Sequence, residues 1–219
     1  MARIATFCVN LMHENTYVFS DDTKECVIID CGCFEQEEKE ALAAYIDENG
    51  LTPKHLLCTH FHLDHVFGNQ FILDKYGLQA EVNPGDHLLY ELQRLQAVAF
   101  ELDDSAAHTP KPSMNLDDGK IIKFGNTEIK VISTPGHSPG GVSLYCESEK
   151  VVFTGDTLFN GTYGAVNLPG GRLSKLYKSI TEKLFLLPEE TIVYPGHGAE
   201  TDIKMEKATN PIRFALMKK

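Results

Sequence analysis

Short runs of apolar residues, rich in β-branched and aromatic side chains, recur along the chain, and a histidine or an aspartate follows each one closely. The runs cover residues 26–29, 56–58, 129–132, 151–154 and 192–194. Runs of this kind, bounded by glycine and proline, are typical of buried β-strands. Because loops at one strand edge of a layered α/β domain commonly build the active site, the polar residues after these runs are the first candidates for chemistry.

Helical periodicity fills the intervals between these runs. It predicts helices over residues 35–49, 66–76, 86–102 and 173–187, the first two followed by the helix-stopping glycines Gly50 and Gly77. Within 86–102 the apolar residues form one stripe: Leu88, Leu92, Leu95, Ala99 and Leu102. We interpret this stripe as core packing, with contact to a substrate as the alternative. Alternation of strands and helices predicts a layered α/β domain with its helices outside, spanning residues 1–219 with a helix–loop insertion around 84–118.

Composition narrows the functional classes. The chain has 219 residues, 42% of them hydrophobic, and a formal net charge of −11. An acidic chain without a basic cluster argues against a nucleic-acid partner. No stretch is long and apolar enough for a membrane span, and the N-terminus lacks the apolar segment of a signal peptide. We therefore expect a cytoplasmic protein that acts on a small molecule, with its six cysteines reduced and Cys58 buried and inert.

The highest density of potential metal ligands lies in residues 59–65, Thr-His-Phe-His-Leu-Asp-His. In an extended segment His60 and His62 point the same way and can reach one ion. A turn before the next helix can direct Asp64 and His65 toward a second ion. Imidazole nitrogens and carboxylate oxygens suit zinc, and also iron or manganese. The pair Cys31 and Cys33 could be half of another metal site, but no second cysteine pair of matching spacing exists.

Three further candidates stand at strand ends: His137, Asp156 and His197. Five histidines and two aspartates suffice for two adjacent divalent ions. One ion would take His60, His62 and His137, and the other Asp64, His65 and His197, with Asp156 bridging them. This assignment leaves coordination positions for water, as a catalytic site requires. The remaining histidines, His13, His55, His87 and His108, are interpreted as ordinary surface or hydrogen-bonded residues.

The order of these motifs resembles the metallo-β-lactamase superfamily over nearly the whole chain. Within it, Thr-Pro-Gly-His-Ser-Pro-Gly at 134–140, Phe-Thr-Gly-Asp-Thr-Leu-Phe at 153–159 and Asn210-Pro211 resemble the short glyoxalase II-like (hydroxyacylglutathione hydrolase-like) hydrolases. The resemblance implies a four-layered αββα sandwich of two mixed β-sheets with outer helices, and a dinuclear site at one edge. It also implies that Asp30, with Thr59, supports the ligand loops, and an aspartate there could accept an N–H from a ligand imidazole. A plain strand-end cap is the alternative for Asp30.

The implied reaction is hydrolysis of a small thioester or ester by a metal-bound hydroxide, with Asp64 orienting the hydroxide or moving its proton. The chain departs from the family where relatives carry Gly-Arg-x-Asp, since residues 164–167 read Gly-Ala-Val-Asn, and Gly141 replaces a second histidine. Few residues follow His197, so we expect no added glutathione-binding domain. Tyr163 and Asn167 are candidate substrate contacts.

Other activities of the fold remain open. A mononuclear-iron sulfur (persulfide) dioxygenase or a lactonase could use the same ligands. Glutamate is usual at the position of His62 in oxygen-reducing diiron domains, and the lack of a signal peptide disfavours a secreted β-lactamase. A non-catalytic metal-binding module with a relic site is the alternative outside enzymes, although relics typically lose ligands.

Overall fold

Two six-stranded β-sheets form the centre of the computed structural model, which describes residues 2–103 and 109–216. The first sheet has the order β1-β2-β3-β4-β5-β6, with strands β1 (Arg3–Val9), β2 (Glu14–Ser20), β3 (Glu25–Ile29), β4 (Thr52–Leu57), β5 (Ala80–Val82) and β6 (Ser113–Met114). The second has the order β14-β13-β10-β9-β8-β7, with strands β7 (Ile121–Phe124), β8 (Thr127–Ser133), β9 (Val142–Cys146), β10 (Val151–Gly155), β13 (Ile192–Pro195) and β14 (Thr201–Asp202). Strands β11 (Leu158–Phe159) and β12 (Thr162–Tyr163) form a small hairpin. Both large sheets contain parallel and antiparallel pairs.

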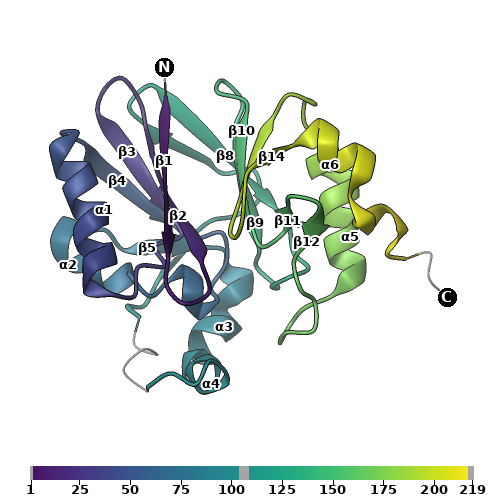
Figure 1. Cartoon of the computed structure of the whole chain (residues 1–219), viewed down its shortest axis with the longest axis horizontal. Coiled ribbons are helices and arrows are strands. Elements are labelled where there is room, and N and C mark those ends of the chain that lie inside the picture. The colour runs from purple at the N-terminus through teal and green to yellow at the C-terminus, as the bar shows by residue number, and fades with distance from the viewer. Residues whose placement is uncertain (1, 104–108, 217–219) are drawn as a thin grey trace.

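Helices cover the outer face of each sheet (Figure 1). α1 (Gln36–Glu48) and α2 (Asn69–Tyr76) lie on the first sheet, and α5 (Leu173–Glu182) and α6 (Ile203–Thr209) lie on the second. α3 (His87–Glu91) and α4 (Gln93–Ala99) lie at one end of the sandwich. Short 3₁₀ turns occupy Leu63–His65, Pro84–Asp86, Leu184–Leu186 and Pro211–Phe214.

The two-residue period of the strands explains the layering. In β3, Cys26 and Ile28 pack toward the helices of the first sheet, whereas Val27 and Ile29 pack between the two sheets. Val152 of β10 likewise faces α5, while its neighbours on the strand face the inter-sheet core. Strands that are apolar on both faces are therefore buried from both sides. The predicted αββα sandwich is confirmed.

Three predicted helices differ in their extent. α2 begins at Asn69 instead of Val66, because a 3₁₀ turn and Gly68 precede it. The predicted helix 173–187 stops at Glu182, since Lys183 leaves helical geometry before a separate turn. The predicted helix 86–102 is divided at Leu92, whose ψ of 12° separates α3 from α4.

The apolar stripe on α3 and α4 lies mostly outside the core, although its last residue, Leu102, packs partly buried against the core of the first sheet. Leu88 is 52% exposed and Leu95 is 65% exposed, so the core-packing interpretation of the stripe is wrong. The buried residues of these two helices include Leu89 and Ala97, which do not belong to the stripe. An apolar face on a helix does not by itself show what covers that face. In α3 and α4 the protein core lies against a different face of the helices.

The cysteines and the helices add two observations. All six cysteines are unpaired, and Cys31, Cys33 and Cys58 are fully buried. Cys58 is thus buried as predicted, and burial raises the pKa of its thiol well above the ordinary value, which disfavours the reactive thiolate. Among the described helices, none combines the length and apolar character needed to cross a membrane.

Candidate metal centre

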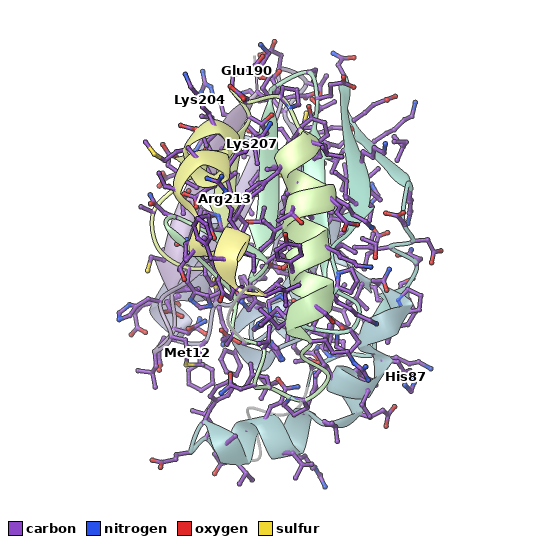
Figure 2. All side chains as sticks on the ribbon, turned by 90° about the vertical axis from the view of Figure 1, so that its right-hand side faces the viewer. Met12, His87, Glu190, Lys204, Lys207 and Arg213 are labelled. Carbon is purple, nitrogen blue, oxygen red and sulfur yellow. The ribbon has the colours of Figure 1, made fainter. Side chains whose placement is uncertain are left out.

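The predicted ligands lie at one edge of the sandwich. Strands β3 and β4 run parallel in the first sheet, and β10 and β13 run parallel in the second, so within each sheet their carboxyl ends meet at the same edge. The loops after these strands and after β8 carry the candidate residues: Asp30, His60, His62, His137, Asp156 and His197. The 3₁₀ turn after His62 adds Asp64 and His65. Met12, which contacts this edge, lies at the end of the molecule that carries α3 and α4 (Figure 2).

These side chains form two triads. The ligand atoms of His60, His62 and His137 lie within 4.8 Å of one another, and so do those of Asp64, His65 and His197. Asp156 lies between the triads. Its Oδ2 is 3.5 Å from His137 Nε2, while its Oδ1 is 3.3 Å from His65 Nε2 and 3.6 Å from His197 Nε2. One carboxylate therefore faces both triads, as a bridging ligand must.

The ring nitrogens that face away from the centre are held by the protein. Thr59 donates its hydroxyl proton to Asp30, so its oxygen accepts from His60 Nδ1 at 3.1 Å. Three more rings are held at Nδ1: His65 bonds to Asp30 Oδ2 at 3.1 Å, His137 to the Ala165 carbonyl at 2.7 Å, and His197 to the Met12 carbonyl at 3.0 Å. In the neutral imidazole, each of these Nδ1 bonds fixes the tautomer and leaves Nε2 as the inward-facing lone pair. His62 differs, because its Nδ1 faces His137 Nε2 at 2.8 Å.

Several inward atoms have no hydrogen-bond partner among the described residues. His60 Nε2, His65 Nε2 and Asp156 Oδ1 are buried and accept or donate no hydrogen bond among the described residues. Buried polar atoms are otherwise almost always satisfied, so unpartnered acceptors that converge on one centre are what divalent cations require. The donor set of imidazole nitrogens and carboxylate oxygens also fits a pair of such ions. These clusters in this fold suggest a dinuclear divalent metal site.

The electrostatics keep His60, His62 and Asp156 in their ligand forms, whereas Asp64 and Asp156 raise the pKa of His65 well above its ordinary value against the effect of burial. Asp64 also raises the pKa of His197, so a metal ion at the second triad must displace protons from these two rings. Burial, followed by the neighbouring His137, lowers the pKa of His62 to about 3, so its imidazole is neutral at neutral pH. Burial also holds the pKa of His60 well below its ordinary value. Burial alone would raise the pKa of Asp156, but the adjacent histidines, His65 foremost, lower it and keep the carboxylate ionised.

Asp30 lies behind the second triad. Its Oδ1 accepts the Thr59 N–H at 2.7 Å, and its Oδ2 accepts the Thr59 hydroxyl at 2.6 Å as well as the His65 ring N–H. Although Asp30, His60 and His65 also cluster, Asp30 contacts the outer side of the His65 ring. Its φ of 50° is a left-handed conformation that a non-glycine residue adopts only when its surroundings hold it there.

Two buried acids near the centre have no signal in the sequence. Glu14 is fully buried with Oε1 at 3.7 Å from His65 Nδ1, and burial raises its pKa well above the ordinary value. Asp86 is also fully buried. It accepts the Phe61 N–H at 3.0 Å, the Ser138 hydroxyl at 3.0 Å and the Gly140 N–H at 2.5 Å. Asp86 thus joins the loop of His60 and His62 to the loop of His137.

The candidate substrate contacts Tyr163 and Asn167 flank the segment whose Ala165 carbonyl bonds to His137. Tyr163 packs partly buried against the core beneath α5, and Asn167 is exposed in the following loop. Of the histidines interpreted as ordinary, His55 pairs with Glu81 and His87 is exposed next to Glu91. His13 is exposed in the β1–β2 turn, and His108 lies outside the described residues.

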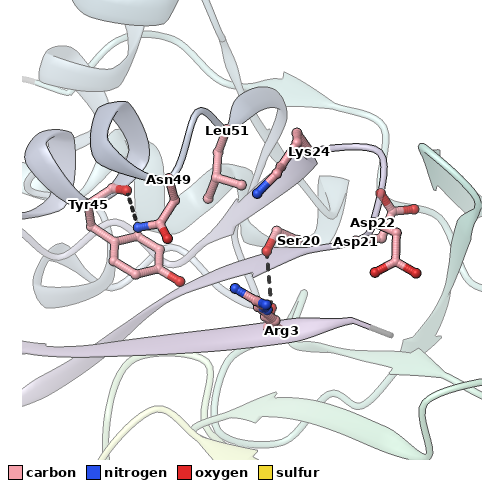
Figure 3. Close-up of a pocket in the computed structure, with 8 residues that line it drawn as sticks. All are labelled: Arg3, Ser20, Asp21, Asp22, Lys24, Tyr45, Asn49 and Leu51. Carbon is pink, nitrogen blue, oxygen red and sulfur yellow. Dashed lines mark hydrogen bonds between the residues drawn. The ribbon is translucent and has the colours of Figure 1, made fainter.

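Two hollows bear on where a substrate could bind. One, of about 150 Å³, is lined by His62, by α3 and α4 and by Leu168 and Pro169. The other, of about 100 Å³, is polar and is lined by residues such as Arg3, Asp21 and Asn49 at the opposite ends of the first sheet's strands (Figure 3). Among the residues lining the second hollow there is no member of either triad. The first hollow alone of these two adjoins the candidate ligands.

Known proteins resemble this chain over nearly all of its length. The sequence profile of the Metallo-beta-lactamase superfamily matches residues 9–197. Hydroxyacylglutathione hydrolase GloC of Haemophilus influenzae is 36% identical, with 93% of this chain and 94% of that protein covered. Probable metallo-hydrolase YqgX of Bacillus subtilis is 34% identical, covering 89% of each. The crystal structure of TTHA1623 in a di-iron-bound form superposes with a TM-score of 0.82 at 35% identity, covering 94% of this chain and 98% of that one.

Proposed function

The chain belongs to the metallo-beta-lactamase superfamily, and we propose that it is a dinuclear metal-dependent hydrolase that cleaves a small thioester or ester. The observation that carries the proposal is the bridging position of Asp156 between two complete triads. A relic binding module would be expected to have lost some of these side chains. The similarity to a hydroxyacylglutathione hydrolase and to a probable metallo-hydrolase supports the reaction class.

The seven side chains would hold the two ions as the triads divide them, with Asp156 shared. Bound there, the ions would supply a water of lowered pKa and a Lewis acid for the carbonyl oxygen. Zinc suits the donors best, but iron and manganese use the same ligands, and a similar structure is a di-iron form.

The chain's own residues then have separate tasks. Asp64 Oδ2 lies 3.2 Å from His197 Nε2, and the nearby histidines, His65 foremost, lower its pKa against the effect of burial. Its carboxylate is thus ionised at neutral pH and can orient a nucleophilic water or accept its proton. Asp30 and Thr59 keep the rings of His60 and His65 in place. The surfaces around His62 would bind the small-molecule substrate.

The test is a panel of thioesters and esters, including S-lactoylglutathione, read by release of the thiol or alcohol. The proposal predicts turnover that is lost in the metal-free protein and returns with added zinc, iron or manganese. Oxygen uptake with glutathione persulfide, measured in parallel, tests the dioxygenase alternative. Oxygen consumption without hydrolysis of any panel member would contradict the proposal, as would turnover that survives removal of the metal.

A further inference from the structure

The hollow beside His62 has the character of a substrate cavity. Its volume is about 150 Å³, which matches an engineered apolar cavity that binds benzene, at about 150 Å³. Its wall on α4 consists of Leu95, Ala99 and the following Phe100, and Leu92 lines it where α3 and α4 meet. Among the described residues that line it, none is charged.

The polar side chains in the lining are already satisfied. Gln96 Oε1 accepts the Leu63 N–H at 3.1 Å, and Gln96 Nε2 donates to the Leu89 carbonyl at 2.9 Å. His62 Nδ1 faces His137 Nε2 at 2.8 Å, within the first triad. The amide of Gln96 is therefore not free to bind a ligand, and the cavity presents mainly apolar surface to one.

Both walls are fastened to the loops that carry the first triad. The Gln96 bond ties α4 to Leu63, the residue after His62. On the other side, Arg172 N–H donates to the Gly136 carbonyl at 2.7 Å, next to His137, and holds the segment of Leu168 and Pro169. The cavity thus keeps a fixed position relative to the triad, and this fixed position accounts for the exposure of Leu95 and Phe100 as walls instead of core.

We propose that this cavity binds an unbranched or benzene-sized apolar acyl group, so that the hydrolase acts on thioesters or esters of apolar acids. The inference rests on the proposed function and extends it to the acyl side of the substrate. A charged carrier such as a glutathione peptide does not suit the cavity, because its charged groups would be buried without partners. Ala165 and Asn167 also leave that side of the entrance without the charged pair of the family pattern.

Binding of straight-chain carboxylates, acetate to octanoate, to the metal-loaded full-length chain tests the cavity without turnover. Calorimetry should show Kd falling about fourfold for each buried methylene. The gain should level off once the chain fills a benzene-sized space. Affinities independent of chain length would overturn the inference.

Variants of α4 provide a matched pair. Leu95 lines the cavity, whereas Val98 on the same helix is 72% exposed and is not among the lining residues. Leu95→Asp should remove the chain-length dependence, and Val98→Asp should preserve it. Ala99→Phe should shift the preference to shorter chains by filling the cavity. Equal effects of Leu95→Asp and Val98→Asp would contradict a specific acyl cavity.

Kinetics separates this inference from the proposed function. With acyl thioesters, kcat/KM should rise with acyl length and be insensitive to the length of an apolar thiol. Cleavage of an acetyl thioester without any effect of acyl length would refute the cavity and leave the hydrolase intact. Failure to cleave any thioester or ester, together with length-dependent carboxylate binding, would refute the hydrolase and leave the cavity. A dependence on thiol length instead would assign the cavity to the leaving group and contradict the proposal.

Discussion

Asp86 holds two ligand loops together, and replacing it with asparagine tests that role quantitatively. Its Oδ2 accepts from Phe61 and Ser138 and its Oδ1 from Gly140, all in a fully buried setting. In either orientation an asparagine amide nitrogen must face at least one of these donors. A buried donor left without an acceptor costs roughly 1–3 kcal/mol, so Asp86→Asn should lower the free energy of unfolding by that amount.

The loss should also reach the metal. Because Phe61 lies between His60 and His62, and Gly140 follows the His137 loop, a shift between these loops separates the first triad. Changes to groups that hold metal ligands typically weaken metal affinity about 10–100-fold.

Urea unfolding of the metal-free protein measures the first effect, and zinc competition against a chromophoric chelator measures the second. The control is Asp117→Asn, at an exposed aspartate remote in sequence from the ligand loops, which should leave both quantities unchanged. Wild-type stability and wild-type zinc affinity in Asp86→Asn would refute the positioning role.

Three further predictions concern the centre itself. His62→Ala or Asp156→Ala should abolish hydrolysis while circular dichroism stays native, since each removes a ligand at a strand end and no core side chain; unchanged turnover in both would refute the site. Gly196→Ala should reduce metal content, because a Cβ there would clash with Asp156 Oδ1 and lie 2.7 Å from His65 Cε1, and full occupancy in that variant would contradict this geometry. Removing the metal with EDTA should lower Tm reversibly, since ligands that bind only the folded state stabilise it, and a Tm indifferent to metal would count against both triads.

Much of the fold was predictable because its determinants are local. Apolar runs at 26–29 and 151–154 indicate these strands directly in the sequence. Alternate residues of each strand then pack either between the two sheets or under the outer helices. The candidate ligands were predictable for the same reason, since each histidine or aspartate follows a strand or stands within a single heptapeptide.

What the sequence could not indicate depends on distant contacts. Asp86 bonds to Gly140 across 54 residues, and Glu14 at the start of β2 lies against His65 in the 3₁₀ turn Leu63–His65, so neither belongs to a local motif. The stripe that contains Leu92, Leu95 and Ala99 was misread because periodicity shows that a face is apolar and not whether protein core or a cavity lies against it.

The metal content of the purified full-length chain tests the central claim most directly. After reconstitution and removal of excess metal, elemental analysis should find two divalent ions per chain, and Asp156→Ala should lower this value because it removes the carboxylate that faces both triads. A chain that retains no stoichiometric metal, or a value that Asp156→Ala leaves unchanged, would contradict a dinuclear hydrolase built on these seven residues.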